Sequence, residues 1–279
     1  MCYLILLLLA LLLVAMSLSA CSNVIFGKRG YSRQQIDNLI IVAHRGASGN
    51  GAPENSLAAI RESLQLGVDM IEVDVRLTKD GELVVCHDAK IDRTTNGKGT
   101  ITDISLDELR NSRIIDKNGT PTNETLPTLG EVLELVDGKC TLLIDVKRGS
   151  NPEQIAKALI NEVALYGAAS WVAVQSFDDD VLEHLHRLGH PFPLEKLFVF
   201  KIPFLPFAYD GKLVGYGYSK YDYISSFNFH YAMLPNALIN RIHSWGKKVK
   251  VWTLGTPSDA LYMPVDGVIT DCPELWKRQ

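Results

Sequence analysis

Apolar runs of strand length alternate with helical patterns along most of the chain. Runs without polar alternation are typical of strands that are buried on both faces, and strands separated by helices form a parallel sheet. The 279 residues suffice for one barrel of the TIM type, which needs ~250. We therefore expect an α/β TIM-type (β/α)8 barrel, whose eight strands are Leu39–Ala43, Met70–Leu77, Leu142–Val146, Trp171–Val174, Leu197–Phe200, Tyr223–Phe227, Val249–Trp252 and Val268–Thr270.

One further apolar run, Leu83–Cys86, breaks the alternation. It is separated from the second strand only by Thr78-Lys79-Asp80-Gly81. Asp-Gly is a turn signal, and four residues are too few for a helical crossover. We expect a hairpin after the second strand, whose return arm brings His87 to about the level of Glu72 and Asp74.

Helix boundaries are legible at three places. Asn55-Ser56 precede Leu57, Ile60 and Leu64 at helical spacing and Gly67 follows them, which predicts a cap, an apolar face and a stop. Val181–Leu188 and Asn236–Trp245 predict two more helices. The segment from about 88 to 125 is polar, rich in Thr, Asn, Gly and Asp, and helical only around Leu106–Arg110, so we expect a small insertion into the barrel.

The N-terminus predicts export. Unbroken apolar sequence runs over Leu4–Ala15, and Leu18-Ser19-Ala20-Cys21 follows, which is the order of a signal peptide and its cleavage site. The second string resembles a bacterial lipobox, and that resemblance implies cleavage before Cys21 and lipidation of its thiol. The expected organisation is a signal peptide over 1–20, a lipidated cysteine and tether over 21–38, and the barrel domain over 39–279.

An uncleaved anchor helix is the alternative, because the stretch up to Ala20 is about long enough to cross a ~30 Å hydrocarbon layer. Both interpretations place the folded domain in the cell envelope, lipid-anchored or helix-anchored on the periplasmic or extracellular face of a bacterial membrane. Cys86, Cys140 and Cys272 remain in the folded body. Each lies in or beside an apolar run, where a small buried thiol is the usual role, and no disulfide framework is indicated.

Composition excludes one class of partner. The net charge is −4, and the chain has no run rich in Lys or Arg on which a phosphate backbone could lie. Nucleic acid is therefore not an expected partner. The apolar fraction of 47% and the charged fraction of 22% are ordinary for a globular domain with a sizeable core.

Two strands carry acids at alternate positions. Residues i and i+2 of a strand point to the same face, so Glu72 and Asp74 share a face of one strand. Asp145 and Lys147 share a face of another strand in the same way, and we expect them to point into the same cavity. The apolar neighbours of Glu72 and Asp74 suit the helix-facing side, so these two acids point inward. Buried carboxylates are costly unless a cation neutralises them, and oxygen ligands suit Mg²⁺ or Ca²⁺. The alternative is that Glu72 and Asp74 only form salt bridges with Arg76 and Lys147.

His44-Arg45-Gly46 closes the first strand. The carboxyl ends of barrel strands are where such folds place their active sites, and an arginine can hold two phosphate oxygens with its planar fork. His44 and His87, the three acids and the Arg45/Lys147 pair fit general acid–base phosphoryl chemistry with metal charge stabilisation. The remaining histidines receive no catalytic role and are expected at the surface or in packing: His184, His186, His190, His230 and His243.

Ten strings in order over Ile41–Pro273 resemble the glycerophosphodiester phosphodiesterase family. They are His44-Arg45-Gly46, Pro53-Glu54-Asn55-Ser56, Glu72-Val73-Asp74-Val75, Thr78-Lys79-Asp80-Gly81, His87-Asp88, Asp92-Arg93-Thr94-Thr95-Asn96-Gly97, Leu126-Pro127-Thr128-Leu129, Ser176-Phe177, Trp252-Thr253 and Thr270-Asp271. Each is weak by itself, but ten in order over one domain are specific.

The resemblance implies a TIM barrel that hydrolyses glycerophosphodiesters to glycerol phosphate and an alcohol with one divalent cation, Ca²⁺ or Mg²⁺. It implies His44 and His87 as the acid–base pair, Glu72 and Asp74 as metal ligands, and Arg45 and Lys147 as phosphate contacts. Asp145 takes the third ligand position, where the family usually has Glu and the related sphingomyelinase D enzymes have Asp. The family mechanism has a substrate hydroxyl attack phosphorus to form a cyclic phosphate, which water opens.

Other functions stay open at this stage. They are a lysophospholipase D-like phosphodiesterase, a non-catalytic barrel that binds phosphodiesters at the envelope, and a zinc metallohydrolase, for which closely spaced ligand histidines are lacking. The aromatic, proline-containing segment 201–222 follows a strand. It forms either an apolar lid beside the site or a cover over the barrel flank.

Overall fold

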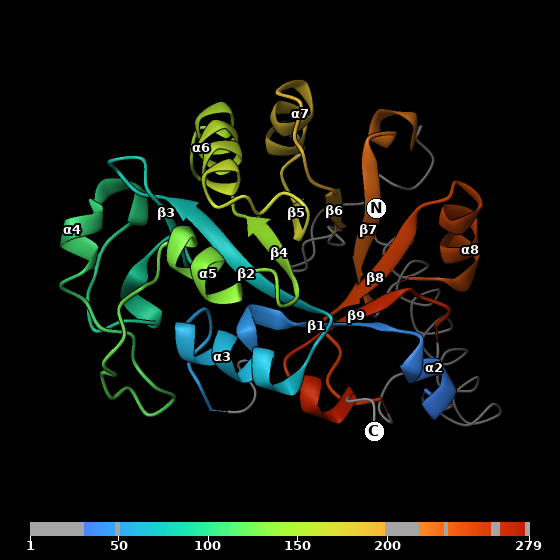
Figure 1. Cartoon of the computed structure of the whole chain (residues 1–279), viewed down its shortest axis with the longest axis horizontal. Coiled ribbons are helices and arrows are strands. Elements are labelled where there is room, and N and C mark those ends of the chain that lie inside the picture. Colours follow the sequence, from blue (N-terminus) through green and yellow to red (C-terminus); the bar gives the residue numbers. More distant parts are fainter. Residues whose placement is uncertain (1–30, 48–50, 199–217, 232–233, 258–262, 277–279) are drawn as a thin grey trace, which may run out of the picture.

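Eight parallel strands close into a barrel, as the alternation of apolar runs and helices predicts (Figure 1). The computed structural model describes residues 31–47, 51–198, 218–231, 234–257 and 263–276. The first strand pairs with both the second and the last, which closes the sheet. The barrel strands are β1 (Ile40–Ala43), β2 (Met70–Leu77), β4 (Thr141–Val146), β5 (Val172–Ser176), β6 (Leu194–Phe198), β7 (Ile224–His230), β8 (Lys248–Trp252) and β9 (Gly267–Thr270).

The hairpin after the second strand is also confirmed. Strand β3 (Leu83–Val85) pairs antiparallel with β2, and Val85 lies opposite Val75. Gly81 takes a φ of 90° in the turn, a conformation that favours glycine. The amide of Cys86 donates to the carbonyl oxygen of Asp74 at 2.9 Å. The next residue along the chain, His87, therefore lies beside the acids of β2.

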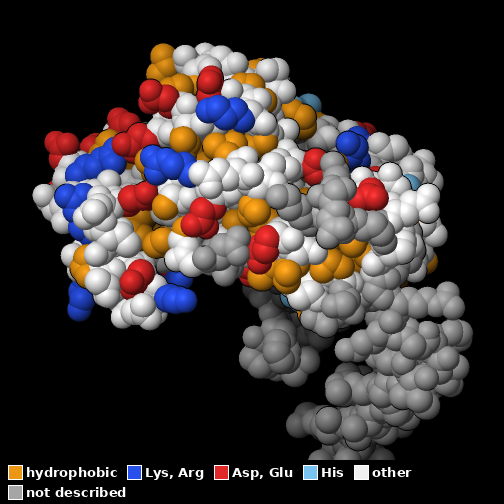
Figure 2. Space-filling view, turned by 60° about the horizontal axis from the view of Figure 1, so that its bottom comes forward, with side chains coloured by type: hydrophobic (Ala, Val, Ile, Leu, Met, Phe, Trp, Pro, Cys, Tyr) orange, Lys and Arg blue, Asp and Glu red, His pale blue; other side chains and the backbone are white. Residues whose placement is uncertain are grey.

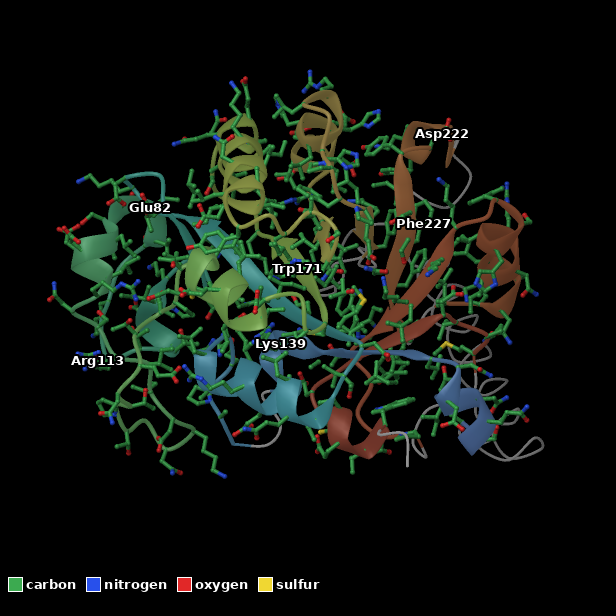
Figure 3. All side chains as sticks on the ribbon, in the orientation of Figure 1. Glu82, Arg113, Lys139, Trp171, Asp222 and Phe227 are labelled. Carbon is green, nitrogen blue, oxygen red and sulfur yellow. The ribbon has the colours of Figure 1, made fainter. Side chains whose placement is uncertain are left out.

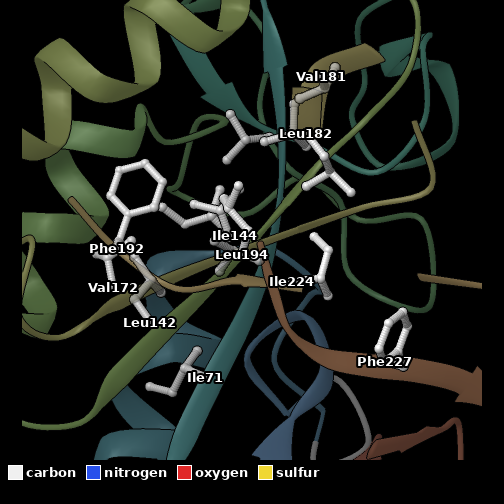
Figure 4. Packing of buried hydrophobic residues seen from close by; sticks show 14 of the residues in the cluster. Ile71, Leu142, Ile144, Val172, Val181, Leu182, Phe192, Leu194, Ile224 and Phe227 are labelled. Atoms are coloured by element: carbon white, nitrogen blue, oxygen red, sulfur yellow. The ribbon is translucent and has the colours of Figure 1, made fainter. Parts of the chain in front are cut away.

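Helices cover the outside of the barrel. Helix α3 (Leu57–Leu66) starts at the expected cap, where Ser56 accepts from the amide of Ala59, and it ends at Gly67 with a φ of 71°. The others are α5 (Leu129–Val136), α6 (Pro152–Leu165), α7 (Asp179–Arg187) and α8 (Asn236–Ser244). Their apolar faces and the outward faces of the strands form the main core (Figure 4).

Polar side chains occupy part of the barrel interior. Lys250 on β8 donates from Nζ to Glu195 Oε1 on β6 at 2.5 Å, and both side chains are buried. Asn228 on β7 donates to the second oxygen of Glu195 and to Gln175 on β5, each at 2.7 Å. This satisfied network explains how a buried strand can contain charged residues.

The expected insertion is a folded element with its own small core. It contains η3 (Ile91–Arg93), η4 (Ile101–Asp103) and α4 (Leu106–Leu109). The buried side chains of this core are Val84, Cys86, Ile91, Ile101, Leu109, Ile114 and Leu126. The insertion is therefore anchored through β3 and held rigid by apolar packing.

Several expected boundaries differ from the structure. The sixth barrel strand was expected to end at Phe227, whereas β7 continues to His230. Two further differences have an identifiable cause. The end of the presumed tether over 21–38 is folded: Ser32 caps helix α2 (Arg33–Asp37), and the side chains of Tyr31 and Ile36 are buried in the main core. The fifth barrel strand was expected over Leu197–Phe200, but β6 begins at Leu194. The start of β6 was missed because two charged residues, Glu195 and Lys196, are not expected in a buried strand. Their charges are neutralised by Lys250 and Asp179, which are distant in the sequence.

Several expectations fall outside the described residues. The signal peptide, Cys21 and most of the segment 201–222 belong to this part of the chain; from 218 onward that segment forms η5 (Tyr218–Tyr221), in which Tyr221 is buried against Phe198 and Phe227. Among the described helices, none is long and apolar enough to cross a membrane. Cys86, Cys140 and Cys272 are free thiols, and Cys86 is fully buried. Figure 2 shows acidic and basic side chains interspersed on the face drawn there.

Candidate active site

Three carboxylates meet inside the barrel. Glu72 and Asp74 point inward from β2, and Asp145 points inward from the neighbouring β4, where it pairs in register with Asp74. One oxygen from each of the three lies within 4.8 Å of the others, and all three side chains are buried. The three acids thus converge as the period of two along a strand predicts, and their ligand role remains a prediction.

Lys147 and Arg45 lie beside the acids. Lys147 Nζ is 2.7 Å from Asp74 Oδ1 and 2.5 Å from Asp145 Oδ2. The backbone amide of Arg45 donates to Glu72 Oε2 at 2.9 Å, and its Nε lies 3.4 Å from Asp74 Oδ2. Of the expected salt bridges, the one between Lys147 and Asp74 is therefore present, and among the described residues none joins Lys147 to Glu72. The salt-bridge alternative fails for Arg76, whose guanidinium donates to the backbone carbonyl oxygens of His87 and Arg148.

The acids differ in their electrostatic environment. Burial and the charges of Asp74 and Asp145 raise the pKa of Glu72 to about 7. Burial also raises the pKa of Asp145, although Lys147 opposes it. For Asp74, burial is outweighed by Lys147 and Arg45, which lower its pKa to about 2. The positive charges of Lys147 and Arg45 therefore do not fully compensate the negative charges of the three carboxylates. An added cation would favour the ionised form of Glu72.

His44 is held by a carboxylate after β9. It lies in η1 (His44–Gly46) directly after β1, and its Nδ1 is 2.6 Å from Asp271 Oδ1. Its Nε2 lies 3.9 Å from Glu72 Oε2. Burial lowers the pKa of His44, but the Asp271 hydrogen bond and the Glu72 charge outweigh it, so the pKa is raised. With Nδ1 donating its hydrogen bond to Asp271, Nε2 is the nitrogen that faces the acids.

His87 is held in the same way by its neighbour in sequence. Its Nδ1 is 2.7 Å from Asp88 Oδ1, which leaves Nε2 for proton transfer. Burial lowers the pKa of His87 and Lys147 adds to this effect, while Asp74 and Asp88 oppose it. The two histidines thus approach the acid cluster from β1 and from the hairpin return arm, each with one nitrogen fixed by a carboxylate.

The sequence did not assign roles to several residues that shape the site. Asn55 donates to Asp74 Oδ2 at 2.7 Å, and its own oxygen accepts from the Asp74 amide at 3.1 Å. Glu54 accepts from both Arg45 and Arg93. These residues, like Asp88 and Asp271, stand in the family-like strings, so a signal was present. Which acid binds which base depends on loop geometry that spacing does not reveal.

Aromatic side chains line another part of the rim. Trp252 at the end of β8 packs edge-on against Phe177, which follows β5, and against His230 at the end of β7, with centroid distances of 5.7 and 5.1 Å. His230 was expected only at the surface or in packing. It packs, but it does so at the carboxyl ends of the strands where the site lies.

The acid cluster fits a hard divalent cation. Asp145 Oδ1 is buried and has no hydrogen-bond partner among the described residues. Together with the other two carboxylates, this oxygen provides an all-oxygen donor set, which Ca²⁺ and Mg²⁺ prefer. Glu72, Asp74 and Asp145 would hold the ion, which would supply charge stabilisation at a phosphoryl oxygen.

Comparisons with known proteins identify the family to which the chain is similar. Residues 44–275 match the model of the glycerophosphoryl diester phosphodiesterase family. The chain is 34% identical over 241 residues to a glycerophosphodiester phosphodiesterase of Caldanaerobacter subterraneus subsp. tengcongensis, which covers 84% of this chain and 95% of that protein. It is 30% identical over 241 residues to one of Bacillus altitudinis, with coverages of 84% and 95%.

Solved structures of phosphodiesterases are also similar to this chain. A glycerophosphodiester phosphodiesterase of Thermotoga maritima superposes with a TM-score of 0.66 at 26% identity, over 85% of this chain and 96% of that one. A phosphodiesterase of Oleispira antarctica, in complex with the product sn-glycerol-3-phosphate, superposes with a TM-score of 0.71 at 25% identity, over 86% and 94%.

Proposed function

The chain belongs to the glycerophosphoryl diester phosphodiesterase family and is a phosphodiesterase, and on that premise we propose that His44 and His87 are the acid–base pair with which it hydrolyses glycerophosphodiesters. The single observation that carries the proposal is the placement of both imidazoles at the acid cluster, each with Nδ1 bound to a carboxylate. That arrangement fixes the tautomer and leaves both Nε2 atoms for proton transfer.

The reaction proceeds in two steps. A hydroxyl of the substrate's glycerol attacks phosphorus while one histidine takes its proton. The other histidine protonates the oxygen of the leaving alcohol, so one P–O bond forms as another breaks and a cyclic phosphate results. Water then opens the ring with the two histidines in reversed roles, and glycerol 3-phosphate is released. Arg45 and Lys147 orient the phosphate oxygens from beside the acids.

The cation is part of the proposal. We assign Glu72, Asp74 and Asp145 to one Ca²⁺ or Mg²⁺, supported by the buried oxygen of Asp145 that has no hydrogen-bond partner in the described part of the chain. The cluster offers carboxylate oxygens and contains no cysteine sulfur, which favours these hard ions over zinc. The shorter Asp145 reaches the cluster because it stands in register with Asp74 on the adjacent strand.

A coupled assay for glycerol 3-phosphate, with glycerophosphocholine as substrate and with or without a chelator, tests the function. We expect His44→Ala and His87→Ala each to lower kcat by ~10²–10⁴-fold, the usual loss for a general acid or base. His186→Ala is the matched control, because the ring contacts of His186 among the described residues are with Tyr223 and His190, outside the proposed site. Near-native kcat in either site variant would return that histidine to a structural role. Phosphodiester binding without turnover by the native chain would favour the non-catalytic alternative.

We also propose that the protein is a lipoprotein of the bacterial cell envelope, attached through Cys21 after removal of residues 1–20. The support is the order of apolar stretch, small residues and cysteine in the sequence. Labelled palmitate should be incorporated into the native protein and not into Cys21→Ala. Equal labelling of both, or a mature chain that still begins before Cys21, would favour the anchor-helix alternative.

A further inference from the structure

Arg93 belongs to the insertion, yet its guanidinium joins the two halves of the site. We propose that Arg93 is a positioning residue that fixes His87 and Arg45 relative to each other, so that the insertion serves catalysis. This inference rests on the proposed roles of those two residues. Within the described ranges, the side-chain hydrogen bonds of Arg93 go to Asp88 and Glu54, and none goes to the acid cluster, Arg45 or Lys147.

The guanidinium uses its planar fork on two carboxylates. Nε donates to Asp88 Oδ2 at 2.6 Å, while Nη1 and Nη2 donate to Glu54 Oε2 and Oε1 at 2.8 and 2.7 Å. A lysine offers one compact ammonium and cannot span both acids in this way. The geometry therefore requires an arginine.

One branch leads to His87. Asp88 binds Arg93 through Oδ2 and the imidazole through Oδ1, so both of its oxygens are engaged. Arg76 donates to the backbone oxygen of His87 at 3.0 and 2.7 Å, which fixes the main chain independently. The rotation of the ring thus depends on Asp88, and the orientation of Asp88 depends on Arg93.

The other branch leads to Arg45. Glu54 Oε1 accepts from Arg93 and also from Arg45 Nη1 at 2.9 Å. With Nη1 held, Arg45 Nε lies 3.4 Å from Asp74 Oδ2 at the edge of the acid cluster. Glu54 follows β1 and Arg93 lies in the insertion after β3, so the chain of bonds joins segments that no strand pairing connects directly.

Stability alone does not account for this arrangement. The Arg93 side chain is 50% exposed, so solvent screens its ion pairs and limits what they contribute to the free energy of unfolding. The position of Arg93 is nevertheless well defined, because η3 is anchored by the buried side chain of Ile91 in the core of the insertion. A rigid support with little stabilising value of its own is what a positioning role requires.

The test separates the two branches. Asp88→Asn disturbs the His87 branch and should mainly lower kcat, whereas Glu54→Gln disturbs the Arg45 branch and should mainly raise KM. Arg93→Gln should do both, with kcat/KM lower by about 10–100-fold, the usual loss for groups that orient a site. Its melting temperature should stay within a few degrees of the native value. Arg113→Gln is the matched control, since Arg113 lies in the same insertion, away from the barrel strands (Figure 3), and its guanidinium donates to the backbone oxygen of Asn123.

Further outcomes decide the inference. The double variant Arg93→Gln/Asp88→Asn should lose no more kcat than Asp88→Asn alone, and losses that multiply would overturn the His87 branch. Arg93→Lys, which keeps the charge, should fold normally and have intermediate activity. Full activity in this variant would show that the bridge between Asp88 and Glu54 is irrelevant. The same conclusion would follow if its activity fell only in proportion to the fraction of unfolded protein. A native enzyme without turnover would instead remove the proposed function, whereas an active native enzyme with an unaffected Arg93→Gln removes only the positioning role.

Discussion

Asn55 is the residue that ties Asp74 to the loop after the first strand. Its side chain is buried, exchanges two hydrogen bonds with Asp74, and rests on a backbone with a φ of 58°. The backbone N–H of Asn55 donates to the backbone carbonyl oxygen of Arg45. Asparagine suits the position because it tolerates this left-handed conformation and offers both a donor and an acceptor.

Asn55→Ala should lower the free energy of unfolding by about 2–4 kcal/mol, because it leaves buried polar groups of Asp74 unsatisfied and strains the backbone. Urea denaturation measures the loss. Asn55→Gly is the control, since glycine adopts the same φ without strain. It should be about 1 kcal/mol more stable than the alanine variant. A loss below about 0.5 kcal/mol in both variants would mean that the Asn55–Asp74 bonds contribute little.

At the residue scale, the sequence predicted the direction of side chains on strands and failed on contacts made by loops. Glu72, Asp74 and Asp145 converge as the period of two requires. The bond between His44 and Asp271 joins residues 227 positions apart and depends on closure of the barrel. Spacing along one strand contains no information on such a pair.

At the scale of elements, the strands and capped helices were predictable where local signals agreed. The hairpin at Asp80-Gly81 and helix α3 follow the sequence closely. The predicted range of strand β6 began too late in the sequence, because Glu195 and Lys196 interrupt the apolar pattern of this strand. Their compensating partners come from β8 and α7, and a window of local sequence cannot show them.

The interior pair of β6 and β8 yields a stability prediction. Lys250→Met leaves the buried carboxylate of Glu195 without its cation, and loss of one partner of a buried pair typically costs about 3–5 kcal/mol. Lys248→Met, on the exposed first residue of the same strand, is the control and should change stability by less than about 0.5 kcal/mol. Similar midpoints of urea unfolding for the two variants would contradict the prediction.

Asp179 at the start of α7 predicts a dependence of stability on pH. Its carboxylate lies 2.9 Å from Lys196 Nζ on β6 and 2.8 Å from Lys220 Nζ in η5. Burial raises its pKa, but the two ammonium groups lower it to about 2 from the ordinary 3.8. Because the folded-state pKa is the lower one, the stabilisation is complete above about pH 4–5 and disappears as the pH falls toward 2.

Asp179→Asn should therefore lower the free energy of unfolding by at most about 2 kcal/mol near neutral pH, and the difference from the native protein should vanish near pH 2. Unfolding by urea over a series of pH values measures it. Asp180→Asn, at the exposed neighbouring position, should run parallel to the native curve. A gap between native protein and Asp179→Asn that stays constant down to pH 2 would exclude the ion pairs as its cause.

At the scale of the molecule, barrel closure and the insertion act together on the site. β1 and β9 deliver His44 and Asp271, while β2, β4 and the hairpin deliver the acids and His87. The TIM-type fold was predictable from the count and alternation of strands. The folded start at Tyr31 was not, because its buried contacts lie with Trp276 and with other residues near the end of the chain.

The same closure makes the acid cluster a site where metal binding and global stability are linked. Three buried carboxylates repel one another in the apo protein, and removal of that repulsion by a bound cation stabilises only the folded state. At a free concentration of 100 times Kd, one bound ion adds about 2.7 kcal/mol. Ca²⁺ or Mg²⁺ should therefore raise the melting temperature of the native protein, and a chelator should reverse the shift.

Glu72→Gln should reverse the order of stabilities. Without metal the variant loses one repelling charge and should melt above the chelated native protein, whereas added metal should raise its melting temperature little, because a ligand is missing. Glu134→Gln, at an exposed position on α5, is the control and should respond to metal as the native protein does. Calorimetry of the three proteins, each with metal and with chelator, gives the six melting temperatures that the comparison needs. If metal stabilised the native protein and Glu72→Gln equally, the cation would bind elsewhere and the assignment of the cluster would fail.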